Sequence, residues 1–307
     1  MKDGLGREIR YLRISVTDKC NLACAYCKPR PVKELRHSDL LTVEQLAFVA
    51  EVFVGLGVNK VRITGGEPLV RKGVAELVGQ ISALGCETVM TTNAVLFPQF
   101  AKKLAAAGLS RVNASLDTLD PRKYAEITGG GNLAEAVDGI RCAADCGFRL
   151  KINAVLQRGV NDDVLPLAEF AQSVGAELRF IELMPFASTT DYFEKRFLPS
   201  AEITEKYGMK FVREEGNVAY YACDAFRAGF ISPLGRKFCS SCDRMRLTST
   251  GLVLPCLHSA LRFDVKPYLG DREALEKFLK ECIASKPPSH NIERGELQQD
   301  DMGSIGG

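Results

Sequence analysis

The 307-residue sequence has no long apolar run, no strong excess of charge of one sign and no low-complexity tract. No stretch approaches the roughly 18 apolar residues that a membrane-spanning helix needs, and the N-terminal MKDGLGREIRYLRIS lacks the apolar core of a signal peptide. A net charge of +2 excludes a general polyanion-binding surface, so any anion site must be local. We therefore expect a cytoplasmic globular protein that binds neither membrane nor nucleic acid.

Cysteine, in contrast, is abundant for a protein of a reducing compartment, where stable disulfides are rare. Of the 11 cysteines, six form two groups: Cys20, Cys24 and Cys27, and Cys239, Cys242 and Cys256. Such clustering indicates metal ligands rather than disulfides. The other five are scattered, and small buried apolar side chains explain them better: Cys86, Cys142, Cys146, Cys223 and Cys282.

An alternation of strand and helix runs through the first two thirds of the chain. The predicted strands are 11–17, 60–64, 87–92, 111–117, 149–155 and 177–183. The predicted helices are 41–57, which Thr42 and Gln45 open with a capping box, 73–84, 97–107, 133–146 and 163–174. This order predicts an α/β fold with a parallel sheet, and six units predict an incomplete TIM-like (β/α)6 barrel.

Beyond residue 214 the alternation ends, which predicts a core domain at 1–214 and a small, irregular C-terminal domain at 215–307. Polar motifs follow the ends of the predicted strands: the Cys20 loop, TGGEP (64–68), TTN (91–93), SLD (115–117) and ELM (182–184). Catalytic groups of parallel barrels gather at the C-terminal rim of the strands. We therefore expect these motifs to converge on one mouth of the barrel.

The first cysteine group has the spacing C-x3-C-x2-C and no nearby fourth ligand, since His37 is ten residues away. Structural zinc sites use four ligands, usually as two separated pairs. An iron–sulfur cluster bound by three thiolates leaves one iron exposed for an exogenous ligand. The spacing therefore favours an iron–sulfur cluster over zinc.

The second group has the spacing C-x2-C-x13-C, and His258 lies two residues after Cys256. A Cys3His zinc site and a three-cysteine iron–sulfur cluster fit this spacing equally well. Arg244 and Arg246 follow the CxxC at once, and two guanidinium groups beside a metal site indicate a polyanionic substrate close to it.

The cysteine loop, with Tyr26 before its third cysteine, and GGEP at 65–68 resemble the radical S-adenosylmethionine (SAM) superfamily. Almost end to end, the sequence resembles the GTP 3′,8-cyclase family of molybdenum cofactor biosynthesis. The motifs that carry this resemblance are LRISVTDKCNLACAYC, KVRITGGEPLVR, TTN, NASLDTLD, KINAVLQRGVND, RFIELM, CSSCDRMRLTSTG and a terminal IGG. It implies a lyase with two [4Fe–4S] clusters, whose open irons bind SAM and the guanine of GTP.

The implied reaction uses a 5′-deoxyadenosyl radical to remove H3′ of GTP and yields (8S)-3′,8-cyclo-7,8-dihydro-GTP. The implied ligands of the SAM cluster are Cys20, Cys24 and Cys27, and those of the auxiliary cluster are Cys239, Cys242 and Cys256. The implied SAM-binding residues are Tyr26, Gly66, Ser115 and Met184. The implied GTP-binding residues are Arg13, Lys60, Arg62, Thr91, Lys151, Arg179, Arg244, Arg246 and Thr248, of which Arg244 and Arg246 are also expected to be catalytic.

The strand pattern independently supports an anion inside the barrel. Lys60 and Arg62 are two apart on one predicted strand and therefore share a face. A buried ring of cations is tolerable only when an anion occupies it. The resemblance further implies an electron donor such as flavodoxin or ferredoxin, and a cyclic pyranopterin monophosphate synthase that receives the product. It also allows a homodimer.

Two positions depart from the family pattern. Ala94 follows TTN where the family has glycine, and at a positive φ this costs roughly 1–2 kcal/mol, so we expect a backbone shift there. Asp300 stands where the C-terminal tail usually carries arginine, and acids near a triphosphate would repel it. Entry of the tail into the site and a disordered terminus are therefore both open.

Two other functions remain to be weighed. The first is another radical SAM enzyme with an auxiliary cluster, such as a peptide maturase, which usually carries more C-terminal cysteines. The second is a zinc-stabilised nucleic-acid-binding module, which the neutral charge balance disfavours. We expect instead two three-cysteine sites that face each other across one positively lined barrel mouth.

Overall fold

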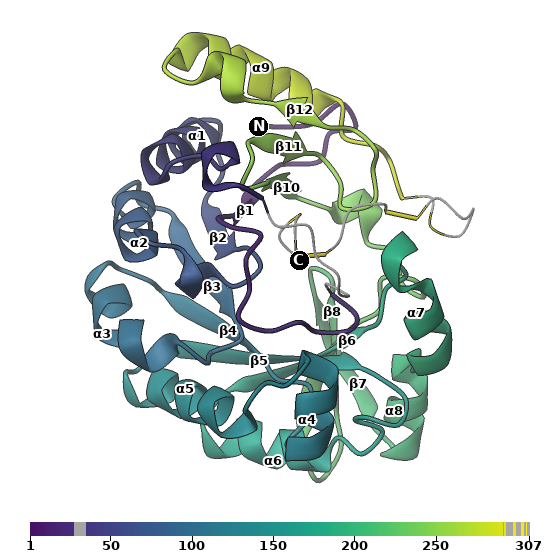
Figure 1. The fold of residues 1–307 in the computed structure, drawn as a ribbon. Helices are drawn as coiled ribbons and strands as arrows, with labels where there is room; N and C mark the ends of the chain where they lie inside the picture. Colours follow the sequence, from purple (N-terminus) through teal and green to yellow (C-terminus); the bar gives the residue numbers. More distant parts are fainter. Residues whose placement is uncertain (28–34, 291, 293–296, 299–301, 304, 306–307) are drawn as a thin grey trace.

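The computed structural model describes residues 1–27, 35–290, 292, 297–298, 302–303 and 305, and these form one curved, twelve-stranded sheet with helices outside it (Figure 1). The sheet order is β12-β11-β10-β1-β2-β3-β4-β5-β6-β9-β8-β7. The strands are β1 Tyr11–Ser15, β2 Lys60–Thr64, β3 Glu87–Thr92, β4 Arg111–Ser115, β5 Arg149–Leu156, β6 Glu177–Glu182, β7 Lys210–Glu215, β8 Val218–Ala222, β9 Arg227–Ile231, β10 Arg244–Leu247, β11 Leu252–Leu254 and β12 Phe263–Asp264.

The α-helices are α1 Val43–Gly55, α2 Val74–Ser82, α3 Phe97–Ala106, α4 Pro121–Thr128, α5 Leu133–Asp145, α6 Leu165–Ser173, α7 Thr190–Arg196, α8 Ser200–Lys206 and α9 Arg272–Ala284. Short 3₁₀ turns are η1 His37–Asp39, η2 Pro68–Val70, η3 Ala187–Thr189, η4 Cys239–Ser241 and η5 Lys266–Tyr268. Within the described ranges, none of the helices has the length and apolar character needed to cross a membrane.

The outer face of the sheet is apolar and packs on the helices. In β1, Leu12 and Ile14 are fully buried and belong to the main core with Leu46 and Phe53 of α1. Burial of each such side chain contributes about 1.5–3 kcal/mol. Because side chains alternate along a strand, the intervening residues of β1 must point to the opposite, inner face.

The six predicted strands and the helices between them are confirmed, with differences of a few residues at their ends. The capping box of α1 is also confirmed: the Thr42 hydroxyl accepts from the Gln45 N–H at 3.2 Å, and Gln45 Oε1 accepts from the Thr42 N–H at 2.9 Å. Helix α4 was missed. Asp120 caps its N-terminus and Gly129 ends it at φ 70°, so the DP…GG pattern was the available signal.

The expectation of an irregular C-terminal segment is wrong, because residues 210–264 supply β7 to β12. β10 pairs in parallel with β1, and β9 pairs in parallel with β6, so the C-terminal part extends the barrel arc on both sides. The predicted boundary at 214/215 falls within β7, and strands from both sides share one sheet. The division into two domains stays a prediction.

Ala94 has a positive φ of 65°, the one non-glycine residue in the described part that does. The chain therefore keeps the left-handed conformation with alanine, and the expected shift away from it is wrong. The neighbouring helix explains why the position is confined: a Cβ on Gly139 of α5 would lie 1.9 Å from the Ala94 carbonyl oxygen.

We predict that Ala94→Gly stabilises the protein by about 1 kcal/mol, because glycine adopts positive φ without the steric cost. Thermal or denaturant unfolding of the apoprotein measures this. Ala105→Gly on the exposed face of α3 is the matched control and should destabilise by about 1 kcal/mol. An Ala94→Gly variant no more stable than the parent would contradict the strain.

Candidate active site

The inner face of the barrel wall is lined by charged side chains. They alternate along the strands with core residues such as Leu12, Val61 and Met245. The cations that sequence reasoning placed there are Arg13, Lys60, Arg62, Lys151, Arg179, Arg244 and Arg246, and the structure adds Arg111. The carboxylates on the described part of this wall are Glu87 and Glu177. Positive charge is therefore in clear excess.

The strand register brings three of these arginines side by side. Arg13 of β1 pairs with Arg246 of β10 on one side and with Arg62 of β2 on the other. Burial, followed by the charge of Arg246, holds the pKa of Arg13 well below its ordinary value. Burial and the charge of Arg244 lower the pKa of Arg246 to about 10. Like charges this close favour an anion among them.

The Tyr11 ring lies among three cations of this wall. Its centroid is 5.4 Å from Lys60 Nζ, 5.5 Å from Arg62 Cζ and 5.8 Å from Arg244 Cζ. Burial tends to raise the pKa of its hydroxyl, but Arg62, Arg13, Arg244 and Lys60 together lower it. Sequence reasoning missed Tyr11, although its alternation with Leu12 places it on the inner face.

Glu177 is the centre of a closed polar network. Its carboxylate accepts from Lys151 Nζ at 3.0 Å, from Arg179 Nε at 2.5 Å and from Tyr220 Oη at 2.7 Å. Arg179 Nη2 also donates to Tyr220 Oη at 2.7 Å. Burial would raise the pKa of Glu177, yet the Arg179 charge and these donors lower it to about 2. Glu177 therefore fixes two predicted GTP-binding cations.

Glu87 holds two further cations of the wall in place. It forms ion pairs with Lys60 at 3.1 Å and with Arg111 at 3.0 Å. Sequence reasoning missed Glu87, Arg111 and Glu177. The available signal was position, since each begins or lies near the start of a strand and faces the same side as the predicted cations.

Further contacts place the remaining predicted substrate residues. Arg62 Nη1 donates to Thr91 Oγ1 at 3.1 Å, so these two side chains lie together. Arg244 Nη2 donates to Asn217 Oδ1 at 2.5 Å. The Thr248 hydroxyl accepts from the Leu252 N–H at 2.9 Å and thereby closes the β10–β11 turn.

The C-terminal tail reaches this wall. Arg246 Nη1 donates to the Ile305 carbonyl at 3.4 Å, and Ile305 packs in a small apolar cluster with Phe186 and Leu254. Met184, predicted to bind SAM, packs against the same cluster. Asp300 and the terminal Gly306–Gly307 lie outside the described residues, so the effect of Asp300 stays a prediction.

The first cysteine loop follows β1 and is fastened to α4. The N–H groups of Ala23 and Ala25 donate to carbonyls of Thr128 and Ile127 at 2.9 Å. Cys20 Sγ accepts from the Leu22 N–H at 3.4 Å and from Asn93 Nδ2 at 3.8 Å. Burial, and then the nearby Cys27, Asp117 and Cys20, raise the pKa of Cys24 well above its ordinary value. Three thiols that interact electrostatically, with N–H groups donating to the sulfur of Cys20, suit an iron–sulfur cluster.

The GGEP turn packs directly on this loop. Gly66 N–H donates to the Thr17 carbonyl at 2.7 Å, and a Cβ on Gly66 would lie 2.3 Å from the Lys19 carbonyl oxygen. Buried Glu67 accepts from Thr92 Oγ1 and from the Asn93 N–H, both at 2.7 Å. The absence of a side chain at Gly66 therefore permits close packing of this turn against the cysteine loop.

Tyr26 is held by a buried carboxylate. Its hydroxyl donates to Asp117 Oδ2 at 2.7 Å, and Asp117 Oδ1 accepts from the Val155 N–H at 2.8 Å. Burial raises the pKa of Asp117 to about 6. Ser115, also predicted to bind SAM, ends β4 two residues before Asp117, so both lie at the C-terminal rim.

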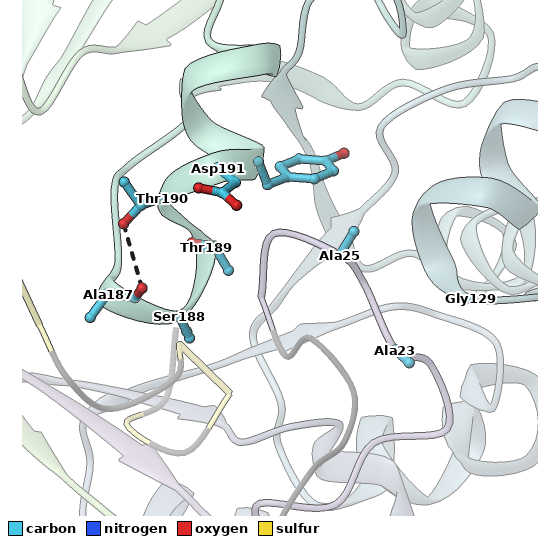
Figure 2. Close-up of a pocket in the computed structure, with 9 residues that line it drawn as sticks. Ala23, Ala25, Gly129, Ala187, Ser188, Thr189, Thr190 and Asp191 are labelled. Atoms are coloured by element: carbon cyan, nitrogen blue, oxygen red, sulfur yellow. Dashed lines mark hydrogen bonds between the residues drawn. The ribbon is translucent and has the colours of Figure 1, made fainter.

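A pocket of about 570 Å³ opens beside the cysteine loop (Figure 2). Ala23, Ala25 and Gly129 line one side, and 187–192 lines the other. Tyr192 of α7 donates from Oη to Gln157 Oε1 at 2.5 Å. None of the predicted site residues lines this pocket, although Cys24 lies between Ala23 and Ala25. The segment 187–192 carried no sequence signal.

The two cysteine triads lie at opposite ends of one strand pair. Cys20 follows β1, whereas Cys242 immediately precedes β10, and these strands are parallel neighbours. Cys256 follows β11, which runs antiparallel to β10 and returns to the same end as Cys242. The expectation of one shared mouth is therefore wrong. The triads flank the cationic wall, and β1, which runs from one end to the other, is itself four residue steps or about 13 Å long.

The auxiliary triad sits among basic groups. Cys242 N–H donates to the Cys239 carbonyl at 3.3 Å. Burial raises the pKa of Cys256, while Lys286 and Arg246 oppose this and Cys242 adds to it. Arg246, Cys242 and Cys256 are thus close enough to influence one another.

His258, the fourth ligand of the zinc alternative, packs between Phe186 and His290, with ring centroids 5.9 and 5.5 Å away. Within the described residues, no three His, Cys, Asp or Glu side chains are gathered closely enough to hold a single metal ion. The ligand roles of the six cysteines stay predictions, supported by spacing and by the surrounding N–H and cationic groups.

The open parallel barrel with a three-cysteine loop after its first strand defines a radical SAM enzyme. Residues 14–171 match the family model of the radical SAM superfamily, and residues 176–292 match that of molybdenum cofactor synthesis C. The chain belongs to the GTP 3′,8-cyclase family and uses SAM with a [4Fe–4S] cluster.

Two relatives illustrate this membership. A GTP 3′,8-cyclase of Pelotomaculum thermopropionicum is 42% identical over 326 aligned positions and all of both chains. One of Peptoclostridium acidaminophilum is 42% identical over 99% of this chain and 98% of its own. Streptococcus suis SuiB bound to S-adenosylmethionine shares the fold with TM-score 0.62 at 16% identity, covering 97% of this chain and 78% of its own.

We predict that Glu177→Gln removes an acid-sensitive part of the stability. The folded pKa of Glu177 is about 2 against an ordinary 4.5, so its contribution is complete above pH 4.5 and disappears as pH falls toward 2. Because the side chain is 34% exposed, we expect about 1–2 kcal/mol rather than the full linkage value.

Unfolding free energies of the apoprotein measured from pH 7 to pH 2 check this prediction. The difference between parent and Glu177→Gln should shrink across that window. Glu205→Gln, on the exposed surface of α8, is the control and should leave the profile unchanged. A constant difference at all pH values would show that Glu177 contributes packing rather than charge.

Proposed function

We propose that this enzyme converts GTP to (8S)-3′,8-cyclo-7,8-dihydroguanosine 5′-triphosphate, the first step of molybdenum cofactor biosynthesis. Cys20, Cys24 and Cys27 hold the SAM cluster. The second part of the proposal is an auxiliary [4Fe–4S] cluster on the other triad, Cys239, Cys242 and Cys256. The observation that carries the proposal is the excess of inward-facing cations between the two triads.

In this proposal the triphosphate of GTP binds to the cations of the wall. Arg13, Arg62 and Arg246 are adjacent in register, and burial lowers the pKa of each. Charge-assisted hydrogen bonds from these guanidinium groups to phosphate oxygens would offset the repulsion among the three positive charges. Lys151 and Arg179 enter the same interior with their orientation already set by Glu177. Binding therefore needs little rearrangement of the wall.

The position of the triads orients the substrate. With phosphates on the cations, the nucleoside lies between the two ends of the β1–β10 pair. When bound, the first cluster and SAM supply a 5′-deoxyadenosyl radical, which removes the hydrogen from C3′ of the ribose. The surrounding wall holds C3′ in place and keeps water and free thiols away from the reacting atoms.

The remaining residue roles are proposed from the family resemblance. Tyr26, Gly66, Ser115 and Met184 remain our proposed SAM-binding residues, and Arg244 and Arg246 our proposed catalytic residues beside the auxiliary cluster. Lys60, Thr91 and Thr248 complete the proposed GTP site. The tail segment at Ile305 touches Arg246 and thereby borders this end of the site.

The partners of the enzyme are part of the proposal. Each turnover requires one electron to cleave SAM and a second, with a proton, to reduce the nucleotide radical left after ring closure. The proposed source is a one-electron donor such as flavodoxin or ferredoxin. The cyclic triphosphate is then passed to the cyclic pyranopterin monophosphate synthase. We also propose a cytoplasmic enzyme that can form a homodimer.

Anaerobic incubation with GTP, SAM and dithionite tests the reaction. We predict that 5′-deoxyadenosine forms only when GTP is present, together with one cyclised nucleotide of the mass of GTP. Deoxyadenosine release that is equally fast without GTP, or with ATP in its place, would refute the substrate. Cys24→Ala is the inactive control, because it removes a ligand of the SAM cluster.

We predict that Arg62→Gln raises KM for GTP about 10- to 100-fold, because one charge-assisted hydrogen bond to a phosphate contributes about 1.5–3 kcal/mol. The affinity for SAM should not change. Arg141→Gln, exposed on α5 outside the barrel wall, is the matched control and should leave both values unaltered. An unchanged KM for GTP in Arg62→Gln would contradict binding of the triphosphate at this wall.

A further inference from the structure

A buried lysine lies beside the proposed auxiliary cluster and has no role in the function described above. Lys286 follows the C-terminal end of α9 and is 5% exposed. Its ammonium group donates to the carbonyl oxygens of Pro255 at 2.5 Å and Arg244 at 2.7 Å. Pro255 directly precedes Cys256, and Arg244 comes two residues after Cys242. One cation therefore ties together the two chain segments that carry these cysteines.

The contacts of Lys286 leave its charge without compensation. Its hydrogen-bond acceptors among the described residues are carbonyl oxygens, which solvate an ammonium group but do not neutralise it. A buried charge with no counter-charge is unfavourable. A [4Fe–4S] cluster with three thiolate ligands is an anion, and its thiolates would stand next to Lys286. The contact of Lys286 Nζ with the carbonyl of Pro255, the residue before Cys256, gives this proximity.

Arg7, a second buried cation, has a different part in the same site. Its guanidinium forms an ion pair with Asp3 at 2.6 Å, so its charge is balanced within the protein. It donates to the Cys239 carbonyl at 2.8 Å and to the Pro287 carbonyl at 2.8 Å. Arg7 therefore fixes the backbone of Cys239, the remaining cysteine of the triad, to the backbone next to Lys286. Arg7 thus anchors the site with its charge paired to Asp3, whereas Lys286 contacts carbonyl oxygens among the described residues.

We propose that Lys286 is the resident cation of the auxiliary cluster, which it positions through the Pro255 and Arg244 carbonyls and whose reduced state its charge stabilises. This rests on the proposed function, since it requires the second cluster. One-electron reduction of a [4Fe–4S] cluster from the 2+ to the 1+ state adds one negative charge and no proton. A fixed ammonium nearby favours the more negative state and raises the reduction potential.

The experiment is an anaerobic redox titration of the reconstituted full-length chain, with dithionite as the reductant and electron paramagnetic resonance as the readout. Addition of SAM shifts the spectrum of the SAM cluster and so separates the two signals. The variants are Lys286→Met, which removes the charge, and Lys286→Arg, which keeps it. Lys280→Met on the exposed side of α9 is the matched control, since Lys280 pairs only with Glu276 on that helix among the described residues.

We expect a more negative potential of the auxiliary cluster in Lys286→Met and no shift of the SAM cluster. Lys286→Arg and Lys280→Met should stay near the parent. Selective loss of about four irons per chain in Lys286→Met, with full content in Lys286→Arg, would equally support the proposal. An unchanged potential at full iron content in Lys286→Met would overturn it, as would the same shift or loss in both Lys286 variants.

Iron analysis of the parent separates this proposal from the one on which it rests. About eight irons per chain indicate two clusters, and about four indicate one. A parent with a single cluster would refute the auxiliary cluster and the role of Lys286 together. A parent with two clusters and an unshifted Lys286→Met variant would refute only the role of Lys286.

Discussion

The structure depends on an excess of positive charge held inside a parallel barrel. Arg13, Arg62 and Arg246 are adjacent across three strands and are buried on the inner face of the sheet. Repulsion among them opposes folding, while the internal carboxylates Glu87 and Glu177 pair with other cations of the wall. The wall therefore forms with a net positive charge among its described residues, and the same charge would attract an anionic substrate.

The C-terminal part of the chain completes this wall instead of standing apart from it. β10 brings Arg244 and Arg246 to one side, and β9 and β8 bring Tyr220 to the other. Gly229 of β9 permits the close packing of the β8 side chains, because a Cβ there would lie 2.5 Å from Val218 Cγ1 and 3.1 Å from Tyr220 Cε1. The parallel pair β1–β10 places one cysteine triad at each end of the interior. Cofactor spacing and substrate charge are thus set by a single sheet.

Local signals identified much of the molecule. The capping box of α1, the alternating strands and the cysteine spacings are each short-range patterns, and the family resemblance named the cations correctly as inward-facing. Helix α4 and strands β7 to β12 were missed because short elements with mixed composition carry weak periodicity. Glu87 and Glu177 were missed because an isolated acidic residue on a strand looks the same whether it faces solvent or a cationic partner.

By itself, the sequence determined the chemistry available: two three-thiol groups, a set of strand-borne cations and a parallel βα order, since residue type and spacing are local properties. Only the tertiary structure decided how these parts relate. The parallel pairing of β10 with β1 put the triads at opposite ends of one interior rather than at one mouth. Chain segments more than 200 residues apart meet there, as Arg7 and Cys239 do, 232 residues apart. No local pattern encodes which distant strand will add to an open sheet edge, because that choice is made by the packing of the whole chain.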